Sequence, residues 1–440
     1  MDILTRVEQE QAYSNLLLNQ TLQKQSPPLE KADAGLTTEL VYGTIQRLNT
    51  LDYFLARFVA KGVAKLEPWV RSLLRLSLYQ LVYLDRIPEH AVVNEAVNLA
   101  KRRGHAGISG MVNGVLRSAI RSRTELVVPT TLPAAERISL LHSYPKWMVE
   151  QWIRQFGEAT AERICESNNR PPAVSVRVNR LRASREAVLQ QMADAGLDAR
   201  PSSIAPSGLI VESGGNMAFS TWFRDGAISI QDESSMLVAE AVDPQPGMTV
   251  LDCCAAPGGK TAHLAERMDD RGRIVACDAH EHKRRLIAEQ AERLGLRSVE
   301  TLTGDARELP QRFPAGAFDR VLLDAPCSGL GVIRRKPDLK WAKQPEEIEA
   351  ITELQAELLD AAAWLVAPGG VLVYSTCTLA AEENGDAVLA FLERHPAFAP
   401  EPMPPALAAL PGAANGQVSL LPSDYGSDGF FIARLRRKDA

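Results

Sequence analysis

From about Ser234 to the C-terminus, short apolar segments alternate with longer amphipathic ones. The strand-like segments are residues 249–252, 273–278, 299–303, 320–324, 370–375 and 430–435. Helix-like segments begin between them, near Lys260, Lys283, Glu346 and Glu382. This alternation predicts a doubly wound, mostly parallel α/β sheet. Because ligands of such sheets bind beyond the carboxyl ends of the strands, the residues at those ends are the first candidates for function.

The first strand-like segment leads into a glycine-rich loop. Its residues, in order, are Asp252, Cys253, Cys254, Ala255, Ala256, Pro257, Gly258, Gly259, Lys260 and Thr261. The last three match the end of a phosphate-binding P-loop, but that motif requires a glycine at position 254, and the first glycine of a dinucleotide fingerprint is also missing. What remains is a loop of small residues whose backbone N–H groups can approach a ligand closely where a helix begins. A plain strand-to-helix turn is the alternative interpretation.

Two acidic residues follow the next two strand-like segments. Asp278 ends the second, where a carboxylate can accept both hydroxyls of a ribose, and Asp305 follows the third, where it suits an adenine amino group. With the glycine-rich loop, these acids describe an adenosine-shaped site. Because no complete phosphate motif is present, we expect an adenosine cofactor without phosphates, S-adenosyl-L-methionine. An ATP-dependent enzyme that uses Gly259, Lys260 and Thr261 is the alternative.

Two cysteines lie at the ends of the next two strand-like segments. The fourth runs through Asp324 into Cys327, and the fifth runs into Cys377. A cysteine is often a small buried hydrophobic residue, and we expect this for Cys165, Cys253 and Cys277. That interpretation does not suit two thiols placed where the ligand crevice should open.

The rest of the chain differs from this α/β part. Residues 1–140 show helical periodicity and carry 17 Lys and Arg against 13 Asp and Glu, although the whole chain has a net charge of −5. The overall negative charge therefore does not exclude an RNA partner. Residues 141–233 mix short strand-like and helical segments, as in a small α+β module. We expect three domains, 1–140, 141–233 and 234–440, with residues 129–133 as a linker.

Several classes of protein are not expected. The apolar segments are shorter than the roughly 18 residues that a membrane helix needs, and the first residues run into Glu8 and Glu10 without the apolar core of a signal peptide. The six cysteines lack a paired C-x-x-C pattern, so neither a disulfide framework nor a metal site is expected. We predict a cytoplasmic protein with reduced thiols and no membrane or metal partner.

Residues 234–435 resemble the RNA 5-methylcytosine methyltransferases that carry both a Pro-Cys and a Thr-Cys motif. The matching segments are Cys254 to Lys260, Asp278, Asp305, Asp324-Ala325-Pro326-Cys327-Ser328-Gly329, Tyr374-Ser375-Thr376-Cys377 and Asp428-Gly429-Phe430-Phe431. The N-terminal part resembles the NusB-like RNA-binding domain through Leu40-Val41-Tyr42-Gly43-Thr44, Asn94-Glu95-Ala96-Val97 and Asn113-Gly114-Val115-Leu116-Arg117. This combination is similar to the bacterial 16S rRNA 5-methylcytosine methyltransferases of the RsmB (Sun/Fmu) type.

The resemblance implies a multidomain fold and a role in rRNA processing and ribosome biogenesis. It implies an all-α NusB-like domain, a small α+β RNA-binding module and a doubly wound, Rossmann-like class I methyltransferase domain. In that family Cys377 would add to C6 of cytosine, which makes C5 nucleophilic, and Cys327 would assist release of the methylated base. Asp324 would hydrogen-bond to N3 of the cytosine and would border the cofactor. Lys260 would either favour a thiolate or serve a structural role.

The same resemblance implies an RNA partner, which we expect to be small-subunit rRNA, as free RNA or in an assembly intermediate, bound by a monomer. Candidate phosphate contacts are Lys101, Arg102, Arg103, Arg334, Arg335 and Lys336, with Arg177 and Arg180 in the central module. A solvated charged face is the alternative for each cluster. Because the target base must reach a thiol, base flipping or a single-stranded loop is expected. A transfer RNA substrate and a non-catalytic NusB-like RNA-binding factor remain alternatives.

Overall fold

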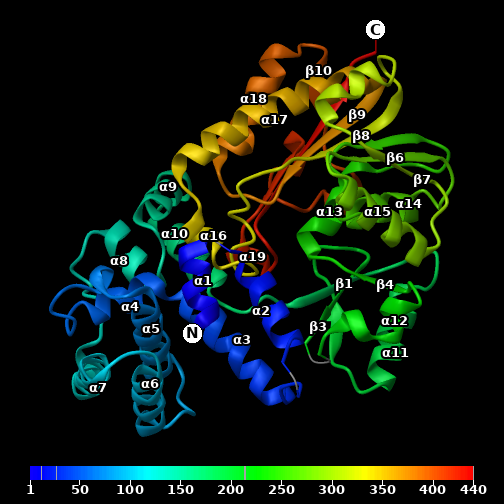
Figure 1. The fold of residues 1–440 in the computed structure, drawn as a ribbon. Coiled ribbons are helices and arrows are strands. Elements are labelled where there is room, and N and C mark those ends of the chain that lie inside the picture. The colour runs from blue at the N-terminus through cyan, green and yellow to red at the C-terminus, as the bar shows by residue number, and fades with distance from the viewer. Residues whose placement is uncertain (11, 26, 213–214, 440) are drawn as a thin grey trace. The chain divides into compact units, whose positions relative to one another are not determined.

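The computed structural model describes residues 1–440 except 11, 26, 213–214 and 440. These residues form two compact units (Figure 1). The helical unit consists of residues 1–170 together with 333–343, and the sheet unit consists of residues 171–332 and 344–440. In the part of the chain that the structure describes, no helix is long and apolar enough to cross a membrane.

The helical unit is built around one apolar helix. Its helices are α1 (Asp2–Glu10), α2 (Ser14–Gln23), α3 (Lys31–Gln46), α4 (Leu48–Leu55), η1 (Val63–Lys65), α5 (Pro68–Tyr83), α6 (Glu89–Arg103), α7 (Ala106–Arg121), η2 (Arg123–Glu125), α8 (Ala134–His142), α9 (Lys146–Phe156), α10 (Glu158–Asn168) and α16 (Leu339–Ala342). Helix α5 buries Leu73, Leu74 and Leu78, in agreement with its nearly all-round apolar pattern. The all-helical prediction for residues 1–140 is confirmed for the described residues.

The helical unit extends beyond the boundary expected at residue 140. Helices α9 and α10 pack against α8, and Tyr144 and Trp152 are fully buried there. Residues 333–343, which the sequence assigned to the C-terminal domain, also belong to this unit. The expected boundary therefore falls inside a compact unit, because the apolar sides of α9 and α10 are covered by helices that precede them.

Segment 333–343 is held in the helical unit by a buried ammonium group. Lys340 is fully buried, and its Nζ donates to Gln46 O at 2.9 Å, Ser143 O at 2.9 Å and Asn169 Oδ1 at 3.1 Å. Burial lowers the pKa of Lys340 well below its ordinary value. Trp341 Nε1 donates to Ile45 O at 2.8 Å. These hydrogen bonds anchor a segment that is distant in sequence from the helices around it.

The sheet unit begins with a small antiparallel sheet that forms the α+β module. Its four strands have the order β2 (Ala199–Pro201), β3 (Gly208–Val211), β1 (Val174–Val178), β4 (Ile228–Ile230). Helices α11 (Arg185–Asp194) and α12 (Thr221–Arg224) and η3 (Met217–Phe219) complete the module. The mixture of short strands and helices predicted for residues 141–233 is confirmed for residues 171–230, apart from 213–214. Strands β2 and β4 are too short to show a pattern in the sequence.

The larger sheet has eight strands and is mostly parallel, as predicted. Its order is β10 (Phe398–Pro400), β12 (Phe430–Arg437), β9 (Val366–Thr376), β8 (Phe318–Asp324), β5 (Thr249–Asp252), β6 (Arg273–Asp278), β7 (Val299–Thr303), with β11 (Gln417–Leu420) paired to β12. Strands β5 to β9 pair in parallel, and β12 is antiparallel to β9. Because β5 lies between β6 and β8, the strand order reverses beside it, and a ligand crevice is expected there.

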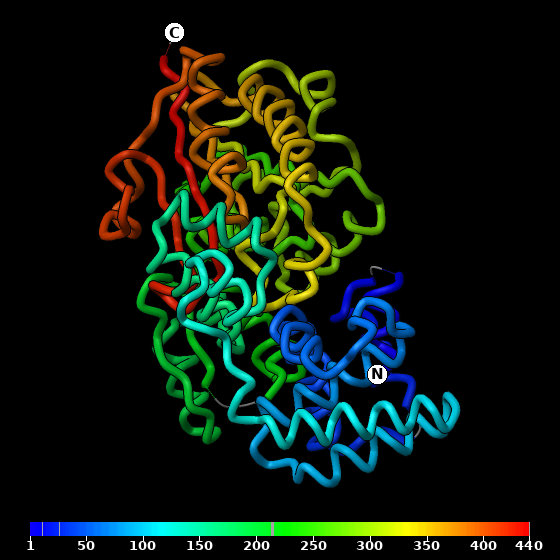
Figure 2. The backbone as a smooth tube through the Cα atoms, turned by 90° about the vertical axis from the view of Figure 1, so that its left-hand side faces the viewer, coloured from blue at the N-terminus to red at the C-terminus, as the bar shows by residue number. Residues whose placement is uncertain are grey.

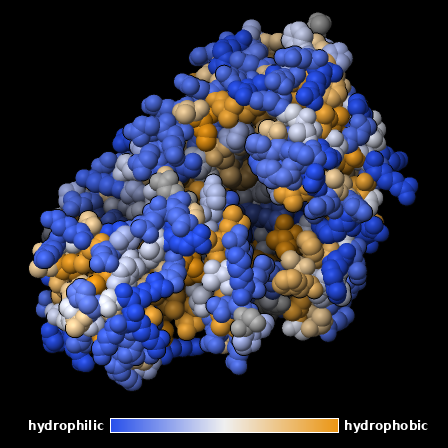
Figure 3. Space-filling view, in the orientation of Figure 1, coloured by the Kyte–Doolittle hydropathy of each residue, from blue (hydrophilic) through white to orange (hydrophobic). Residues whose placement is uncertain are grey.

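Helices cover both faces of the larger sheet (Figures 1 and 2). One face carries α13 (Glu233–Val242), α14 (Gly259–Arg267) and α15 (Glu281–Leu294), and the other carries α17 (Pro345–Leu365) and α18 (Gly385–Arg394). The remaining elements are η4 (Ala306–Gln311), η5 (Ala381–Glu383), η6 (Pro405–Leu407), η7 (Ala413–Asn415) and α19 (Pro422–Tyr425). Each face has its own apolar core, and polar side chains predominate on the surface seen in Figure 3.

A buried ion pair joins the small sheet to the larger one. Arg177 of β1 is fully buried, and its Nε and NH2 donate to the carboxylate of Glu266 in α14 at 2.9 and 2.7 Å. A third donor, Arg177 NH1, reaches Gly259 O at 2.9 Å. Arg177 is therefore a structural residue, and its proposed role as an RNA contact is wrong, because its guanidinium group is not accessible to a phosphate.

We expect Arg177→Met to lower the free energy of unfolding by about 3–5 kcal/mol, because the substitution leaves the Glu266 carboxylate buried without its cation. Chemical denaturation monitored by fluorescence measures this change. The double variant Arg177→Met/Glu266→Leu should recover most of the loss, since it buries no unpaired charge. Arg273→Met, which breaks the exposed pair with Glu300, is the matched control and should cost less than about 1 kcal/mol. Equal effects of Arg177→Met and Arg273→Met would contradict the prediction.

Candidate active site

The residues that the sequence placed at strand ends meet at one edge of the larger sheet. Parallel pairing sets Asp252 beside Leu322, Asp278 beside Thr303, and Asp324 beside Ser375. The loops that follow β5, β6, β8 and β9 therefore leave the sheet on the same side. This edge brings together the glycine-rich loop, two acids and both candidate thiols.

The glycine-rich loop turns sharply into α14. Gly258 has a φ of +100°, and a Cβ there would lie 3.1 Å from Ile287 Cα, so only glycine fits without strain. Helix α14 begins at Gly259, which directs its first backbone N–H groups toward the sheet edge. The Thr261 hydroxyl donates to Asp252 Oδ2 at 2.7 Å. This hydrogen bond ties the first turn of α14 to the end of β5.

Asp252 is the buried carboxyl of the loop. Burial raises its pKa to about 7, which outweighs the opposite effect of the hydrogen bond from Thr261. Its Oδ1 is buried and has no hydrogen-bond partner among the described residues. An acceptor of this kind beside a helix N-terminus fits the charged amino group of an amino-acid-like ligand, as S-adenosylmethionine has.

Asp278 and Asp305, the other two acids predicted to bind the cofactor, differ in their surroundings. Asp278 is 7% exposed and accepts a hydrogen bond from the His280 backbone N–H at 3.1 Å. Asp305 already pairs with Arg307 at 2.6 Å, and this hydrogen bond lowers the pKa of Asp305. An adenine amino group at Asp305 would share this carboxylate with Arg307. Nothing in the sequence around Arg307 predicted it as a neighbour of the site.

Asp324 is held from two sides. Lys260 Nζ donates to Asp324 Oδ2 at 2.8 Å, and Ser375 Oγ donates to Asp324 Oδ1 at 2.7 Å. Burial alone would lower the pKa of Lys260, but Asp324, its hydrogen bond and the nearby Cys377 outweigh burial and raise it. Lys260 therefore remains a cation that interacts with both the acid and the sulfur. An ammonium group near a sulfur favours the thiolate over the thiol.

The two strand-end thiols are in contact. Cys327 Sγ lies 3.3 Å from Cys377 Sγ, and both side chains are partly exposed, whereas Cys165, Cys253 and Cys277 are buried as predicted. The hydrogen bond with Cys377, together with burial, raises the pKa of Cys327 well above its ordinary value. Cys327 therefore favours the neutral thiol beside Cys377.

Close backbone contacts fix the loops around the thiols. Gly331 N donates to Cys377 O at 2.9 Å, and Gly429 N donates to Gly331 O at 2.8 Å. A Cβ on Gly331 would lie 2.0 Å from Gly429 O, so a side chain does not fit there. This packing explains why the segment that contains Gly429 is part of the motif although it follows the thiols by many residues.

The basic residues predicted to contact RNA lie in different environments of the helical unit. Arg334 is 6% exposed and its NH2 donates to Ser167 Oγ at 2.9 Å. The prediction that Arg334 contacts an RNA phosphate is therefore wrong. Arg335 is partly exposed and Lys336 is exposed. Lys101, Arg102 and Arg103 form the exposed last turn of α6, where Arg103 pairs with Asp2 at 2.6 Å.

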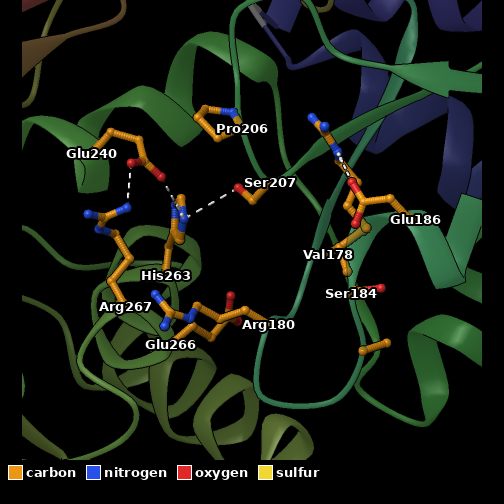
Figure 4. A pocket seen from close by; sticks show the side chains of 12 residues that line it. Val178, Arg180, Ser184, Glu186, Pro206, Ser207, Glu240, His263, Glu266 and Arg267 are labelled. Carbon is orange, nitrogen blue, oxygen red and sulfur yellow. Dashed lines mark hydrogen bonds and ion pairs between the residues drawn. The ribbon is translucent and has the colours of Figure 1, made fainter. Parts of the chain in front are cut away.

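A separate cavity of about 410 Å³ lies between β1 and α14 (Figure 4). It contains none of the strand-end residues. His263 and Glu240 line it, and Glu240 pairs with Arg267 (Figure 4). Burial lowers the pKa of His263 well below its ordinary value, and its Nδ1 has no partner among the described residues. Across the described ranges no group of three or more His, Cys, Asp and Glu could hold a metal ion.

Comparison with known proteins identifies the family. The protein named "Probable ribosomal RNA small subunit methyltransferase B" of Bacillus subtilis (strain 168) is 45% identical over 443 residues, which cover 100% of this chain and 98% of that protein. The chain belongs to the 16S rRNA methyltransferase RsmB/F family. The model of this family matches residues 239–436, that of the NusB family matches 1–121, and that of the RsmF/B-like ferredoxin-like domain matches 144–218.

Solved structures of related proteins have the same fold. The crystal structure of PH0851 covers 99% of this chain and 97% of its own, with a TM-score of 0.82 and 29% identity. The structure of NSun6 from Pyrococcus horikoshii with SFG covers 68% of this chain and 100% of its own, with a TM-score of 0.62 and 25% identity. The predicted NusB-like domain, α+β module and Rossmann-like methyltransferase domain are confirmed, and this RsmB/F member is an S-adenosylmethionine-dependent methyltransferase.

The raised pKa of Asp252 predicts a pH effect on stability. Because its folded-state pKa of about 7 exceeds the ordinary 3.8, its contribution is fully present below pH 4 and is lost as the pH rises through 7. Between pH 5 and pH 8, wild type should therefore lose about 2–3 kcal/mol relative to Asp252→Asn. Urea unfolding at both pH values measures this difference. The exposed Asp225→Asn variant is the control, and parallel pH profiles of wild type and Asp252→Asn would contradict the prediction.

Proposed function

We propose that this protein transfers a methyl group from S-adenosylmethionine to C5 of a cytosine in 16S rRNA. The observation that carries the proposal is the 3.3 Å contact between Cys327 and Cys377 at the sheet edge that also bears the glycine-rich loop. The Bacillus subtilis relative named above, a probable ribosomal RNA small subunit methyltransferase, supports the substrate class. Two adjacent thiols suit chemistry in which one forms a covalent bond and the other helps to break it.

Cys377 is the proposed nucleophile. Cytosine C5 is a weak nucleophile within an aromatic ring, and addition of the Cys377 thiolate to C6 converts C5 into an enamine-like carbon. Bound S-adenosylmethionine supplies an electrophilic methyl carbon. The Lys260 ammonium favours the attacking thiolate. N3 takes up a proton from solvent as the sulfur adds, and the Asp324 oxygens each keep a second lone pair that can accept this new N–H.

Cys327 has a different role in the proposed cycle. After methyl transfer, solvent water takes the proton from C5, and the electrons of that C–H bond restore the double bond as the C6–sulfur bond breaks. Cys377 regains its thiolate, and N3 returns its proton to solvent. The pKa of Cys327 is raised, so it lies beside Cys377 as a neutral thiol. From there it assists release of the methylated base.

The RNA arrangement is part of the same proposal. A monomer binds small-subunit rRNA in the cytoplasm, as free RNA or in an assembly intermediate, through exposed cations that include Lys101, Arg102, Lys336 and the partly exposed Arg335. The target cytosine leaves any base stack to reach the thiols. A transfer RNA substrate would use the same chemistry. A non-catalytic RNA-binding factor would have no use for the paired thiols.

The division of roles between the thiols predicts opposite behaviour of two variants. Cys327→Ala should accumulate a covalent protein–RNA adduct, because methyl transfer proceeds but release is slow. Cys377→Ala should abolish both turnover and adduct. Denaturing gels with labelled RNA and methyl-transfer assays measure these outcomes, with the buried Cys165→Ala as control. An adduct in Cys377→Ala but not in Cys327→Ala would reverse the assignment.

The substrate and cofactor assignments are tested together. We expect methylation of stripped small-subunit RNA and little methylation of total transfer RNA, measured as incorporation of labelled methyl groups. S-adenosylhomocysteine should raise the melting temperature, because it binds the folded state, whereas ATP should not. Preferential methylation of transfer RNA would refute the rRNA substrate. Stabilisation by ATP alone would refute the cofactor.

A further inference from the structure

We propose that two adjacent residues, Glu383 and Asn384, are positioning residues that hold the two thiols separately. Glu383 fixes the loop of Cys327, and Asn384 fixes the loop of Cys377. Both are buried, with exposures of 0% and 7%, where η5 gives way to α18. The proposal rests on the function proposed above and assigns each residue to a different step of the reaction.

Glu383 hydrogen-bonds directly to Ser328, which follows Cys327, and through Gln355 to Pro326, which precedes it. Its Oε2 accepts the Ser328 backbone N–H at 2.8 Å, and its Oε1 accepts the Ser328 hydroxyl. Gln355 of α17 donates from Nε2 to Glu383 Oε2 at 3.0 Å and to Pro326 O at 2.9 Å. Glu383 and Gln355 thus hold the chain immediately before and after the sulfur-bearing residue.

The burial of Glu383 makes this connection rigid. A carboxylate without solvent is tolerated only when hydrogen-bond donors surround it. Movement of the Cys327 loop would remove the two donors that Ser328 supplies. The cost of leaving the carboxylate without them keeps the loop in one conformation. Cys327 is therefore held in place by a group that does not touch its sulfur.

Asn384 is connected to both residues that flank Cys377. Its Oδ1 accepts the Thr376 hydroxyl at 2.5 Å, and its Nδ2 donates to Thr378 O at 3.1 Å. The two contacts need one acceptor and one donor on the same side chain, which an asparagine provides and an aspartate does not. Asn384 thus holds the chain on each side of the nucleophile.

The hydrogen bonds of Glu383 and those of Asn384 are linked beside the thiols. Ser328 Oγ and Thr378 Oγ1 are 2.7 Å apart, next to the 3.3 Å contact of the two sulfurs. Each positioning residue nevertheless acts on one loop. Because addition uses Cys377 and release uses Cys327, disturbing the two loops should affect opposite ends of the reaction. A general loss of structure would affect both ends alike.

The test compares adduct formation and adduct resolution in variants of the full-length protein with labelled small-subunit RNA. Asn384→Asp should slow adduct formation by about tenfold to a hundredfold, since small displacements of a reacting group cost this much. Glu383→Ala should form the adduct at nearly the wild-type rate but resolve it about tenfold or more slowly, so that adduct accumulates. Glu382→Gln, an exposed neighbour, is the matched control and should change neither rate.

The conservative variant Glu383→Gln separates positioning from simple packing. Its amide oxygen can still accept the Ser328 and Gln355 N–H groups, and its amide nitrogen can donate to the Ser328 hydroxyl, so resolution should return to within a few-fold of wild type. If Glu383→Ala does not fold, Ser328→Ala provides the test. That variant removes one donor to Glu383 and should also accumulate adduct.

Two results would overturn the proposal. The first is that the Glu383 and Asn384 variants change the rates of adduct formation and adduct resolution by the same factor. The second is that Glu383→Gln resolves the adduct as slowly as Glu383→Ala. Failure of the proposed function has a different signature, since wild type itself would then form no Cys377-dependent adduct. If wild type forms the adduct and the variants form and resolve it at wild-type rates, the positioning roles alone are refuted.

Discussion

The ion pair between Lys260 and Asp324 connects the elements from which the active site is built. Lys260 belongs to the first turn of α14, Asp324 ends β8, and Ser375, which donates to the other oxygen of Asp324, lies in β9. One carboxylate therefore joins the cofactor loop, the Cys327 loop and the Cys377 strand. Burial lowers the pKa of Lys260, and the pair with Asp324 outweighs this effect, so a positive charge remains near Cys377. The geometry of the site and its electrostatics thus have the same origin.

The two thiols are chemically equivalent as residues, and only their surroundings distinguish them. Cys377 is near the Lys260 ammonium, whose pKa it helps to raise, whereas the pKa of Cys327 is raised by Cys377 and by burial. A pair of thiols 3.3 Å apart cannot both ionise at low cost, because two like charges would share one poorly solvated site. The Lys260 cation favours a charge on Cys377, whereas the raised pKa of Cys327 favours its neutral form.

The strand-end residues could be predicted from sequence because parallel strands bring their carboxyl ends to one edge, whatever lies between them. Asp252, Asp278 and both thiols needed only this rule. Glu383 and Asn384 could not be found this way, since an acid and an amide before a helix are typical of an ordinary helix start, and their partners lie up to 55 residues away. Arg334 was misassigned for a related reason. Its place next to the Cys327 loop in sequence indicated the sheet edge, whereas the chain from Ile333 onward packs in the helical unit.

The packing of segment 333–343 in the helical unit limits how the enzyme can be separated into domains. The chain leaves the sheet unit at Val332, a few residues after Cys327, and in the next residues the buried Lys340 and the partly buried Trp341 donate to carbonyl oxygens of the helical unit. Removal of residues 1–140 would take Gln46, one of the three acceptors of Lys340 Nζ, and removal of residues 1–170 would take all three. A buried amino group without its acceptors is costly, so segment 333–343 would leave its present conformation. The NusB-like part therefore stabilises a segment of the polypeptide that continues directly from the Cys327 loop.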